Sequence, residues 1–207
     1  MKNEFDFFLN NHNLFILGEA GVGKTNLIRI AIGKEFDPNT SSTLSSSYCD
    51  AIIEVDKKQY RYFLWDTAGQ ETYRSLNQLF IKDSKVILIV FAINARESFN
   101  QVDFWHKYVK DLLGESGYIV ALIGNKSDLY EEEDVVKDEE ISKKAEEFGV
   151  KNKVTSACTD ADGFRKFLNE ILTDYIKKYN PEEYKGGNAF KIDQKKKKDN
   201  KDGKKCC

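Results

Sequence analysis

The sequence lacks any apolar run long enough to cross a membrane, and its start does not resemble a secretion signal. No stretch of the 207 residues approaches the roughly 18 to 20 consecutive apolar positions of a spanning helix. Residues 1–6 show no basic segment followed by an apolar one. At 41% hydrophobic residues the chain has room for one ordinary globular domain, and we expect it to be made and kept in the cytosol.

Cysteine and histidine are scarce, with four and two residues. Cys49 and Cys158 lie in the body of the chain, whereas Cys206 and Cys207 are its last two residues. Because no Cys-x-x-Cys occurs, neither a zinc site nor a disulfide framework is expected. We expect Cys49 and Cys158 to be small buried residues, as free cysteines usually are.

The chain has no large excess of charge of either sign, since its formal net charge is only -2. This balance argues against a nucleic-acid partner. The sum hides a division, however, because residues 191–205 hold eight lysines against three aspartates and the remainder of the chain is acidic. Lysine runs are usually just solvated, but this one is followed directly by Cys206 and Cys207, which indicates a lipid anchor with polybasic support.

Apolar runs alternate with segments of helical spacing, which predicts an α/β fold. Apolar runs typical of parallel strands buried on both faces occur at 13–17, 86–91 and 118–123. Helices are predicted at 24–32, 98–113, 139–148 and 163–179. Segments 51–55 and 59–65 predict a hairpin that adds one antiparallel strand to an otherwise parallel sheet. We expect a domain over residues 1–179 and a disordered polybasic tail over 180–207.

Residues 18–25 form the pattern Gly-x4-Gly-Lys-Thr between a predicted strand and a predicted helix, which is the context of a phosphate-binding loop. Glycines let backbone N–H groups surround a phosphate, and the helix N-terminus adds positive dipole. Lys24 would span the β- and γ-phosphates, and the Thr25 hydroxyl would ligate Mg²⁺. An ordinary glycine-rich turn without a ligand would not require Lys-Thr at its end or a strand and a helix on either side. The motif alone is nevertheless also compatible with ATPases and nucleotide kinases.

Two further motifs follow predicted strands and point to GTP. In Asp66-Thr67-Ala68-Gly69-Gln70, the Asp66 carboxylate can hold Mg²⁺ through water, the Gly69 N–H can reach the γ-phosphate, and Gln70 can orient the attacking water. In Asn125-Lys126-Ser127-Asp128, the Asp128 carboxylate can accept both N1–H and the amino group of guanine, a pair that adenine cannot offer.

Ser156-Ala157 follows a last short strand and is a weak signal by itself. There the Ala157 N–H could meet guanine O6, and the Ser156 hydroxyl could brace Asp128.

Together these residues resemble the small GTPases of the Ras superfamily over about residues 10–178. The chain is most similar to the Rab branch, on residues 65–71, on residues 73–76 and on the terminal Cys206-Cys207. The CaaX box usual in Ras and Rho relatives is absent, and 128–156 leaves no room for a Rho-type insert. The resemblance implies a P-loop NTPase fold, the Ras-like G domain, whose six-stranded, mostly parallel sheet has one antiparallel strand and helices on both faces.

The resemblance also completes the set of expected site residues. It implies that Thr43 is the switch I ligand of Mg²⁺, with Thr40 as the competitor, and that Phe36 lies beside the guanine. The expected nucleotide contacts are Gly18, Glu19, Ala20, Gly21, Val22, Gly23, Lys24, Thr25, Asn26, Phe36, Thr43, Gly69, Asn125, Lys126, Asp128, Ser156, Ala157 and Cys158. The expected metal ligands are Thr25, Thr43 and Asp66, the catalytic residues Gln70, Lys24 and Thr43, and the prenylated residues Cys206 and Cys207.

The function implied is that of a Rab-type GTPase, which binds GTP or GDP with Mg²⁺, hydrolyses GTP slowly and regulates vesicle trafficking. Its two switch segments would be 37–47 and 67–78. Implied partners of the monomeric core are effectors, an exchange factor, a GTPase-activating protein, a prenylation escort and a GDP-dissociation inhibitor. The implied location is the cytoplasmic face of endomembranes, with a cytosolic pool.

Departures from the family keep alternatives open. Ser45 replaces the usual switch I glycine, 79–84 replaces a common Rab sequence, and Cys158 replaces a lysine. The first two departures put the identity of effectors and regulators in doubt. Ala20 and the unusual switch I also leave open a second function, a nucleotide-locked, membrane-anchored scaffold with little hydrolysis. Gln70 argues against that scaffold. An ATP-using P-loop enzyme is opposed by the guanine motif and by the absence of a lid or substrate domain.

Overall fold

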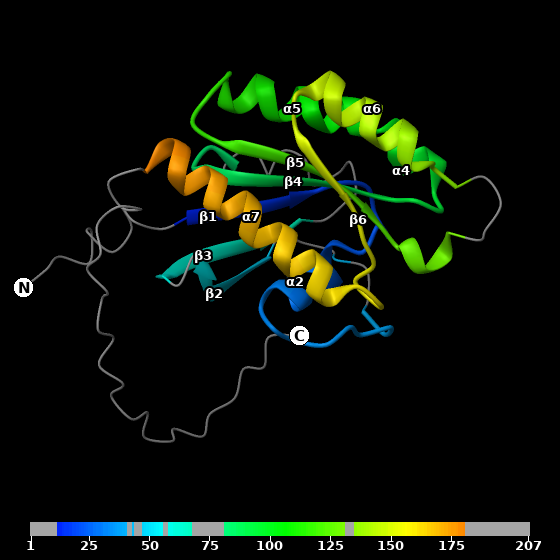
Figure 1. Cartoon of the computed structure of the whole chain (residues 1–207), viewed down its shortest axis with the longest axis horizontal. Helices are drawn as coiled ribbons and strands as arrows, with labels where there is room; N and C mark the ends of the chain where they lie inside the picture. Colours follow the sequence, from blue (N-terminus) through cyan, green and yellow to red (C-terminus); the bar gives the residue numbers. More distant parts are fainter. Residues whose placement is uncertain are drawn as a thin grey trace, which may run out of the picture.

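The computed structural model describes residues 12–40, 43, 47–55, 58–67, 81–130 and 135–180, and its centre is a six-stranded sheet. The strands are β1 (His12–Leu17), β2 (Ser47–Val55), β3 (Lys58–Asp66), β4 (Ser84–Ala92), β5 (Ile119–Asn125) and β6 (Lys151–Val154). They lie in the order β2-β3-β1-β4-β5-β6, and only the β2–β3 pair is antiparallel (Figure 1). The predicted fold class is confirmed.

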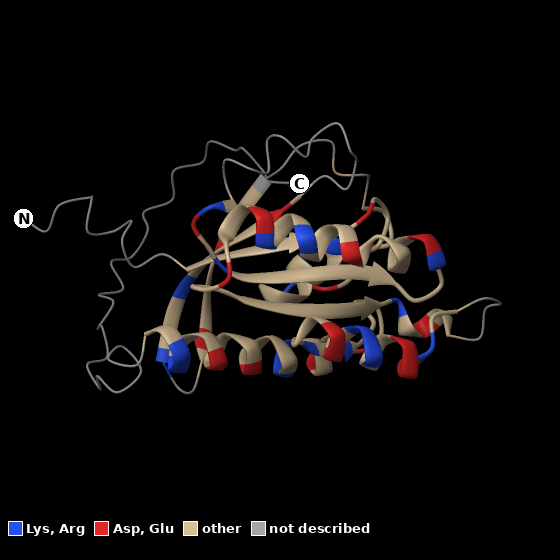
Figure 2. Cartoon of the chain, turned by 90° about the horizontal axis from the view of Figure 1, so that it is seen from above, with Lys and Arg blue, Asp and Glu red and all other residues tan. Residues whose placement is uncertain are grey.

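Helices cover both faces of the sheet. They are α2 (Lys24–Ala31), α4 (Arg96–Asn100), α5 (Val102–Leu113), α6 (Asp138–Phe148) and α7 (Ala161–Tyr179), with a short 3₁₀ helix, η2, at Ser127–Leu129. Helices α2 and α7 pack on one face, and α4, α5 and α6 pack on the other (Figure 1). Viewed from above, the sheet lies between two helical layers (Figure 2).

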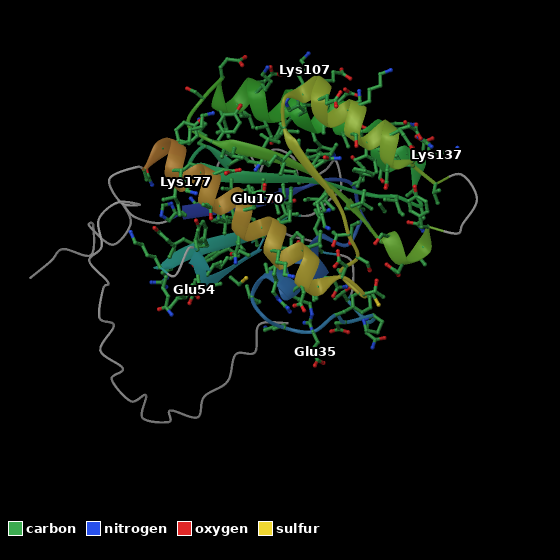
Figure 3. All side chains as sticks on the ribbon, in the orientation of Figure 1. Glu35, Glu54, Lys107, Lys137, Glu170 and Lys177 are labelled. Carbon is green, nitrogen blue, oxygen red and sulfur yellow. The ribbon has the colours of Figure 1, made fainter. Side chains whose placement is uncertain are left out.

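Successive side chains of the central strands point to opposite faces of the sheet and so form two hydrophobic cores. Leu14 and Ile16 of β1 pack towards α2 and α7, while Phe15 and Leu17 pack towards α5 and α6, and all four are fully buried. A parallel strand between two helical layers must be apolar on both faces, which explains its continuous apolar run. Charged side chains lie on the outer surfaces, as at the exposed Lys107 and Glu170 (Figure 3).

The single helix predicted over 98–113 is wrong, because the structure divides this segment into α4 and α5 at Gln101. The Ser98 hydroxyl donates to the carbonyl of Ala95 at 2.7 Å and accepts the Ala92 N–H at 3.0 Å. These bonds fix the short α4 to the end of β4 before α5 begins. Val102 and Trp105 of α5 are buried, which agrees with the helical spacing of the apolar residues in this segment.

Two expectations about single residues also fail. Cys49 is only half-buried, and Cys158 is exposed, so the prediction that both are buried is wrong. Cys49 lies on β2, an edge strand of the sheet, and Cys158 lies at the rim of a pocket described below. Among the helices that the structure describes, none is long and apolar enough to cross a bilayer.

Candidate functional site

The loop between β1 and α2 turns sharply at two glycines. Gly18 has a φ of +142°, and a Cβ there would lie 2.0 Å from the carbonyl oxygen of Val90 on the neighbouring strand. Gly23 has a φ of +93°, and its Cβ would lie 2.3 Å from the Asn125 Nδ2 atom. Positive φ and these close approaches both require glycine, so the glycines of the motif let the loop fold back over β4 and β5.

Lys24 is the first residue of α2, and only 6% of it is exposed. Its ammonium donates to the carbonyl oxygens of Gly18 at 2.9 Å and Glu19 at 2.7 Å. Burial lowers the pKa of Lys24 to about 8, while the carboxylates of Asp66 and Glu19 act in the opposite direction. A buried cation at the mouth of such a loop is stabilised by an anion such as a phosphate oxygen.

Beside Lys24, Thr25, Thr43 and Asp66 bring hydroxyl and carboxylate oxygens together. The Thr25 hydroxyl donates to Asp66 Oδ2 at 2.7 Å, and Thr43 Oγ1 lies 3.0 Å from Thr25 Oγ1. Asp66 Oδ1 is buried and has no hydrogen-bond partner among the residues that the structure describes. Burial also raises the pKa of Asp66, against the effects of Thr25, Lys24 and Thr43. Oxygen ligands around an unpaired carboxylate oxygen fit a Mg²⁺ ion.

Thr40, the competing candidate for the metal, has other contacts. Its hydroxyl accepts from the Asn26 side chain at 3.3 Å, whereas Thr43 Oγ1 lies 3.4 Å from Asp66 Oδ2. The geometry therefore favours Thr43 over Thr40 as the switch I ligand.

At the other end of the site, Ser156 holds the Asp128 carboxylate by a hydrogen bond. The Ser156 hydroxyl donates to Asp128 Oδ1 and accepts the backbone N–H groups of Cys158 and Thr159 at 3.0 and 3.1 Å. Lys126 adopts a left-handed conformation with a φ of 68°. A strained backbone at such a position is typical of binding sites.

Asn125 connects the two ends. Its Nδ2 donates to the carbonyl oxygen of Val22 at 2.8 Å, and its Oδ1 accepts the N–H of Ala157 at 3.0 Å. The Ala157 amide, which the sequence suggested for guanine O6, is thus directed at Asn125. Both bonds are buried, so one side chain links the phosphate loop to the loop after β6.

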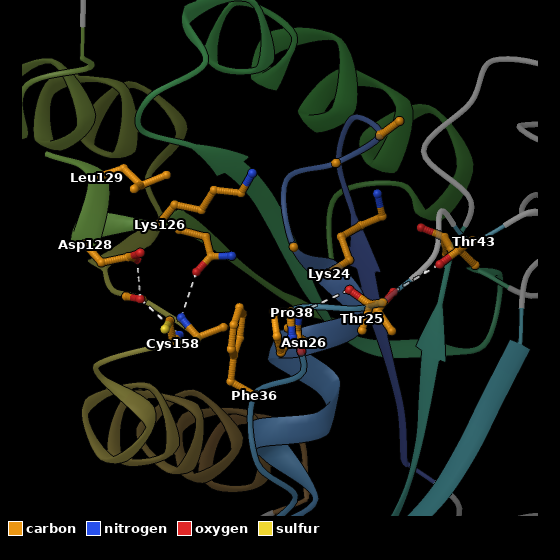
Figure 4. A pocket seen from close by; sticks show the side chains of 18 residues that line it. Lys24, Thr25, Asn26, Phe36, Pro38, Thr43, Lys126, Asp128, Leu129 and Cys158 are labelled. Carbon is orange, nitrogen blue, oxygen red and sulfur yellow. Dashed lines mark hydrogen bonds between the residues drawn. The ribbon is translucent and has the colours of Figure 1, made fainter. Parts of the chain in front are cut away.

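A pocket of about 330 Å³ joins these groups at the carboxyl ends of the parallel strands. Figure 4 shows Asp128, Lys126 and Cys158 towards one end and Lys24, Thr25 and Thr43 towards the other. This size suits a nucleotide-sized ligand. The edge of an α/β sheet where strands end is also the usual position for such a site.

Most of the predicted contacts in the described part of the chain line this pocket, with exceptions at Gly18, Glu19 and Val22. The Glu19 carboxylate accepts the indole N–H of Trp105 at 3.1 Å. Val22 is buried in the core and contributes its carbonyl to Asn125.

The predicted metal ligand Asp66 borders Thr67 rather than lining the pocket itself. Gly69, Gln70, Cys206 and Cys207 lie outside the described residues.

Sequence reasoning missed three lining residues, Pro38, Thr67 and Leu129. Each is adjacent to, or within two positions of, a residue that was predicted. Thr67 is buried, and its hydroxyl donates to the carbonyl oxygen of Ile16 at 2.6 Å, which fixes the start of the segment after Asp66. Its place inside the Asp-Thr-Ala-Gly motif was the signal that could have found it.

Comparison with known proteins agrees with this arrangement. The family model described as "Ras family" matches residues 13–178. A relative, the "Probable Ras-related protein Rab-4A" of Echinococcus multilocularis, is 34% identical over 175 residues, which are 83% of this chain and 77% of the relative. The chain therefore belongs to the Ras family, as a Rab-like small GTPase that hydrolyses GTP.

Proposed function

We propose that this protein is a Rab-type switch that cycles between GTP-bound and GDP-bound states with Mg²⁺ and regulates vesicle trafficking. One observation carries the proposal: a single pocket joins the phosphate loop and Lys24 to Asp128, which Ser156 braces. The membership in the Ras family and the similarity to a Rab-related protein support it.

Binding of the nucleotide divides between the two ends of the pocket. Lys24 and the backbone N–H groups of residues 18–26 hold the phosphates, with the positive end of α2 directed at them. Asp128 accepts from N1–H and the amino group of guanine, while Phe36 lies beside the base. The backbone of Ala157 and Cys158, together with Asn125, Lys126 and Ser156, completes the base end.

Thr25, Thr43 and Asp66 would hold Mg²⁺, and the unpaired Asp66 Oδ1 supports this assignment. A bound Mg²⁺ neutralises phosphate charge during phosphoryl transfer. The roles of these three residues are then to fix the position of the phosphate end: Thr25 and Thr43 through their hydroxyls, and Asp66 through its carboxylate.

Hydrolysis requires a water held in line with the terminal phosphate, and we assign this role to Gln70, with the Gly69 N–H on the γ-phosphate. No arginine occurs among the described residues that line the pocket. Intrinsic turnover is therefore expected to be slow, on the order of 10⁻⁴ to 10⁻² s⁻¹, and to need a GTPase-activating protein.

The experiment that tests this function compares the wild type with Gln70→Leu. The variant should keep its affinity for GTP but lose the water-orienting carboxamide, so hydrolysis slows about tenfold or more. Phosphate release from the preloaded protein in a single turnover measures it, and fluorescent-nucleotide titration checks the affinity. If the wild type already hydrolyses GTP as slowly as the variant, the protein acts as a nucleotide-locked scaffold and the proposed switch function is wrong.

We further propose that residues 1–179 are the GTP-binding domain and that residues 180–207 attach it to the cytoplasmic face of endomembranes. Prenylation of Cys206 and Cys207 would supply two chains, and the lysines of residues 191–205 would face anionic lipids. The proposed partners of the monomeric core are effectors, an exchange factor, a GTPase-activating protein, a prenylation escort and a GDP-dissociation inhibitor.

Replacing both Cys206 and Cys207 by serine is expected to move the protein into the cytosol. Each lysine near an anionic leaflet contributes only about 1 kcal/mol, and salt screens it. The single variants should retain one chain and bind membranes marginally. Fractionation of expressing cells with a high-salt wash measures this, and Cys49→Ser serves as the control. A double variant that stays in the washed pellet would show that the anchor lies elsewhere.

A further inference from the structure

The side chain of Asn26 lines the pocket and also holds the segment that follows α2. Its Nδ2 donates to the carbonyl oxygen of Asp37 at 3.1 Å, and its Oδ1 accepts the N–H of Asp37 at 3.0 Å. The same Nδ2 lies 3.3 Å from Thr40 Oγ1. One carboxamide therefore pairs with both backbone groups of Asp37 and with the hydroxyl of Thr40.

These contacts connect two parts of the site. Asn26 lies in the first turn of α2, directly after Lys24 and Thr25, and only 6% of it is exposed. The segment that it holds, residues 36–40, supplies Phe36, Pro38 and Thr40 to the pocket lining. In Figure 4, Asn26, Phe36 and Pro38 lie together between the two ends of the pocket.

A second side chain of α2 also reaches this segment but is more exposed. Arg29 Nε donates to the carbonyl oxygen of Glu35 at 3.1 Å, and its guanidinium lies 3.5 Å from the Asp37 carboxylate. That ion pair is about one-third exposed on each side, and exposed pairs of this kind contribute little. Asn26 itself is only 6% exposed, so its partly buried bonds are the stronger attachment of residues 36–40 to α2.

We propose that Asn26 is a positioning residue that holds residues 36–40 over the bound nucleotide and so slows its release. The inference rests on the proposed nucleotide site. Release requires residues 36–40 to move away from the pocket, and this movement breaks the bonds to Asp37 and Thr40. Asn26 consequently acts on the lifetime of the complex rather than on its formation, because binding precedes closure of the segment.

The test measures release and association separately with a fluorescent GDP analogue. Asn26→Ala is expected to raise the release rate constant about tenfold or more, since three hydrogen bonds are lost. The association rate constant should change by less than about twofold. A site that is simply damaged would lose association as well, so this split distinguishes positioning from structural failure.

Three further variants sharpen the comparison. Asn26→Asp keeps an acceptor for the Asp37 N–H but places a carboxylate against the Asp37 carbonyl, so release should be at least as fast as in Asn26→Ala. Thr40→Ala removes one contact and should give a smaller increase. Asn39→Ala changes an exposed asparagine of the same segment, outside the pocket lining, and should release GDP at the wild-type rate.

Each result separates the two proposals. Wild type that binds the fluorescent GDP, together with an Asn26→Ala variant that releases it at the wild-type rate, would overturn the role of Asn26 alone. A wild type that does not bind guanine nucleotides would overturn the proposed function itself. Melting of the GDP-saturated proteins checks that every variant is folded before the rates are compared.

Discussion

The Asp128→Asn variant is expected to bind GTP about a hundredfold or more weakly than the wild type and to gain affinity for xanthosine triphosphate. In the proposed site the carboxylate accepts two hydrogen bonds from guanine, whereas an amide presents an NH₂ group that donates towards the guanine donors. Xanthine carries an oxygen at that place and can accept. Because the Ser156 hydroxyl can still donate to the amide oxygen, the brace beneath the residue should survive the change.

Equilibrium titration with both nucleotides measures this exchange of preference. Asp111→Asn makes the same chemical change on the exposed surface of α5 and should leave both affinities unaltered. Loss of GTP binding without any gain for xanthosine triphosphate would indicate damage to the pocket. Unchanged GTP affinity would remove Asp128 from the base end altogether.

Gly18→Ala is expected to lower the free energy of unfolding by about 3 kcal/mol or more. The added Cβ would stand 2.0 Å from the Val90 carbonyl oxygen, a backbone atom that can move only if β4 moves. The positive φ of +142° adds strain for any residue with a side chain. Denaturant unfolding with and without GDP measures the loss.

Gly33→Ala provides the matched control, because its φ of +80° is also positive but nothing lies within 4 Å of the added Cβ. That variant should lose about 1 kcal/mol, the cost of the backbone conformation alone. Equal losses at the two positions would mean that the approach to Val90 adds nothing. A larger loss at Gly18 would locate the cost in the turn between β1 and α2.

Much of the fold could be predicted because its central strands are apolar on both faces and its helices carry clear stripes. The edge strand β2 was harder to predict: it begins at Ser47, four residues before the predicted start. Its exposed positions, such as Asp50, follow the register of β3 rather than an apolar pattern. The break at Gln101 was missed for a similar reason, since the Ser98 hydroxyl accepts the N–H of Ala92 at the end of β4, a contact that depends on the folded backbone.

In the candidate site, too, local sequence motifs could be identified, whereas contacts between residues far apart in the sequence could not. The motifs predicted Lys24, Thr25, Asn125 and Asp128 as site residues, and the structure brings all four to one pocket because each lies near the end of a strand or at the start of a helix. Sequence could not reveal that the Asn26 carboxamide turns to Asp37, because the partner lies 11 positions further along the chain. Gln70 stays a prediction.

Asn125 also limits how the pocket could be redesigned. Its amide supports the phosphate loop at Val22 and the loop after β6 at Ala157. Exchanging the whole segment 125–128 for a sequence that reads another base would remove this support together with the old base preference. A change at Asp128 alone leaves it standing. If Asp128 sets the base preference as proposed, that preference can be changed at one position, whereas the rest of the motif cannot be exchanged without loss of this support.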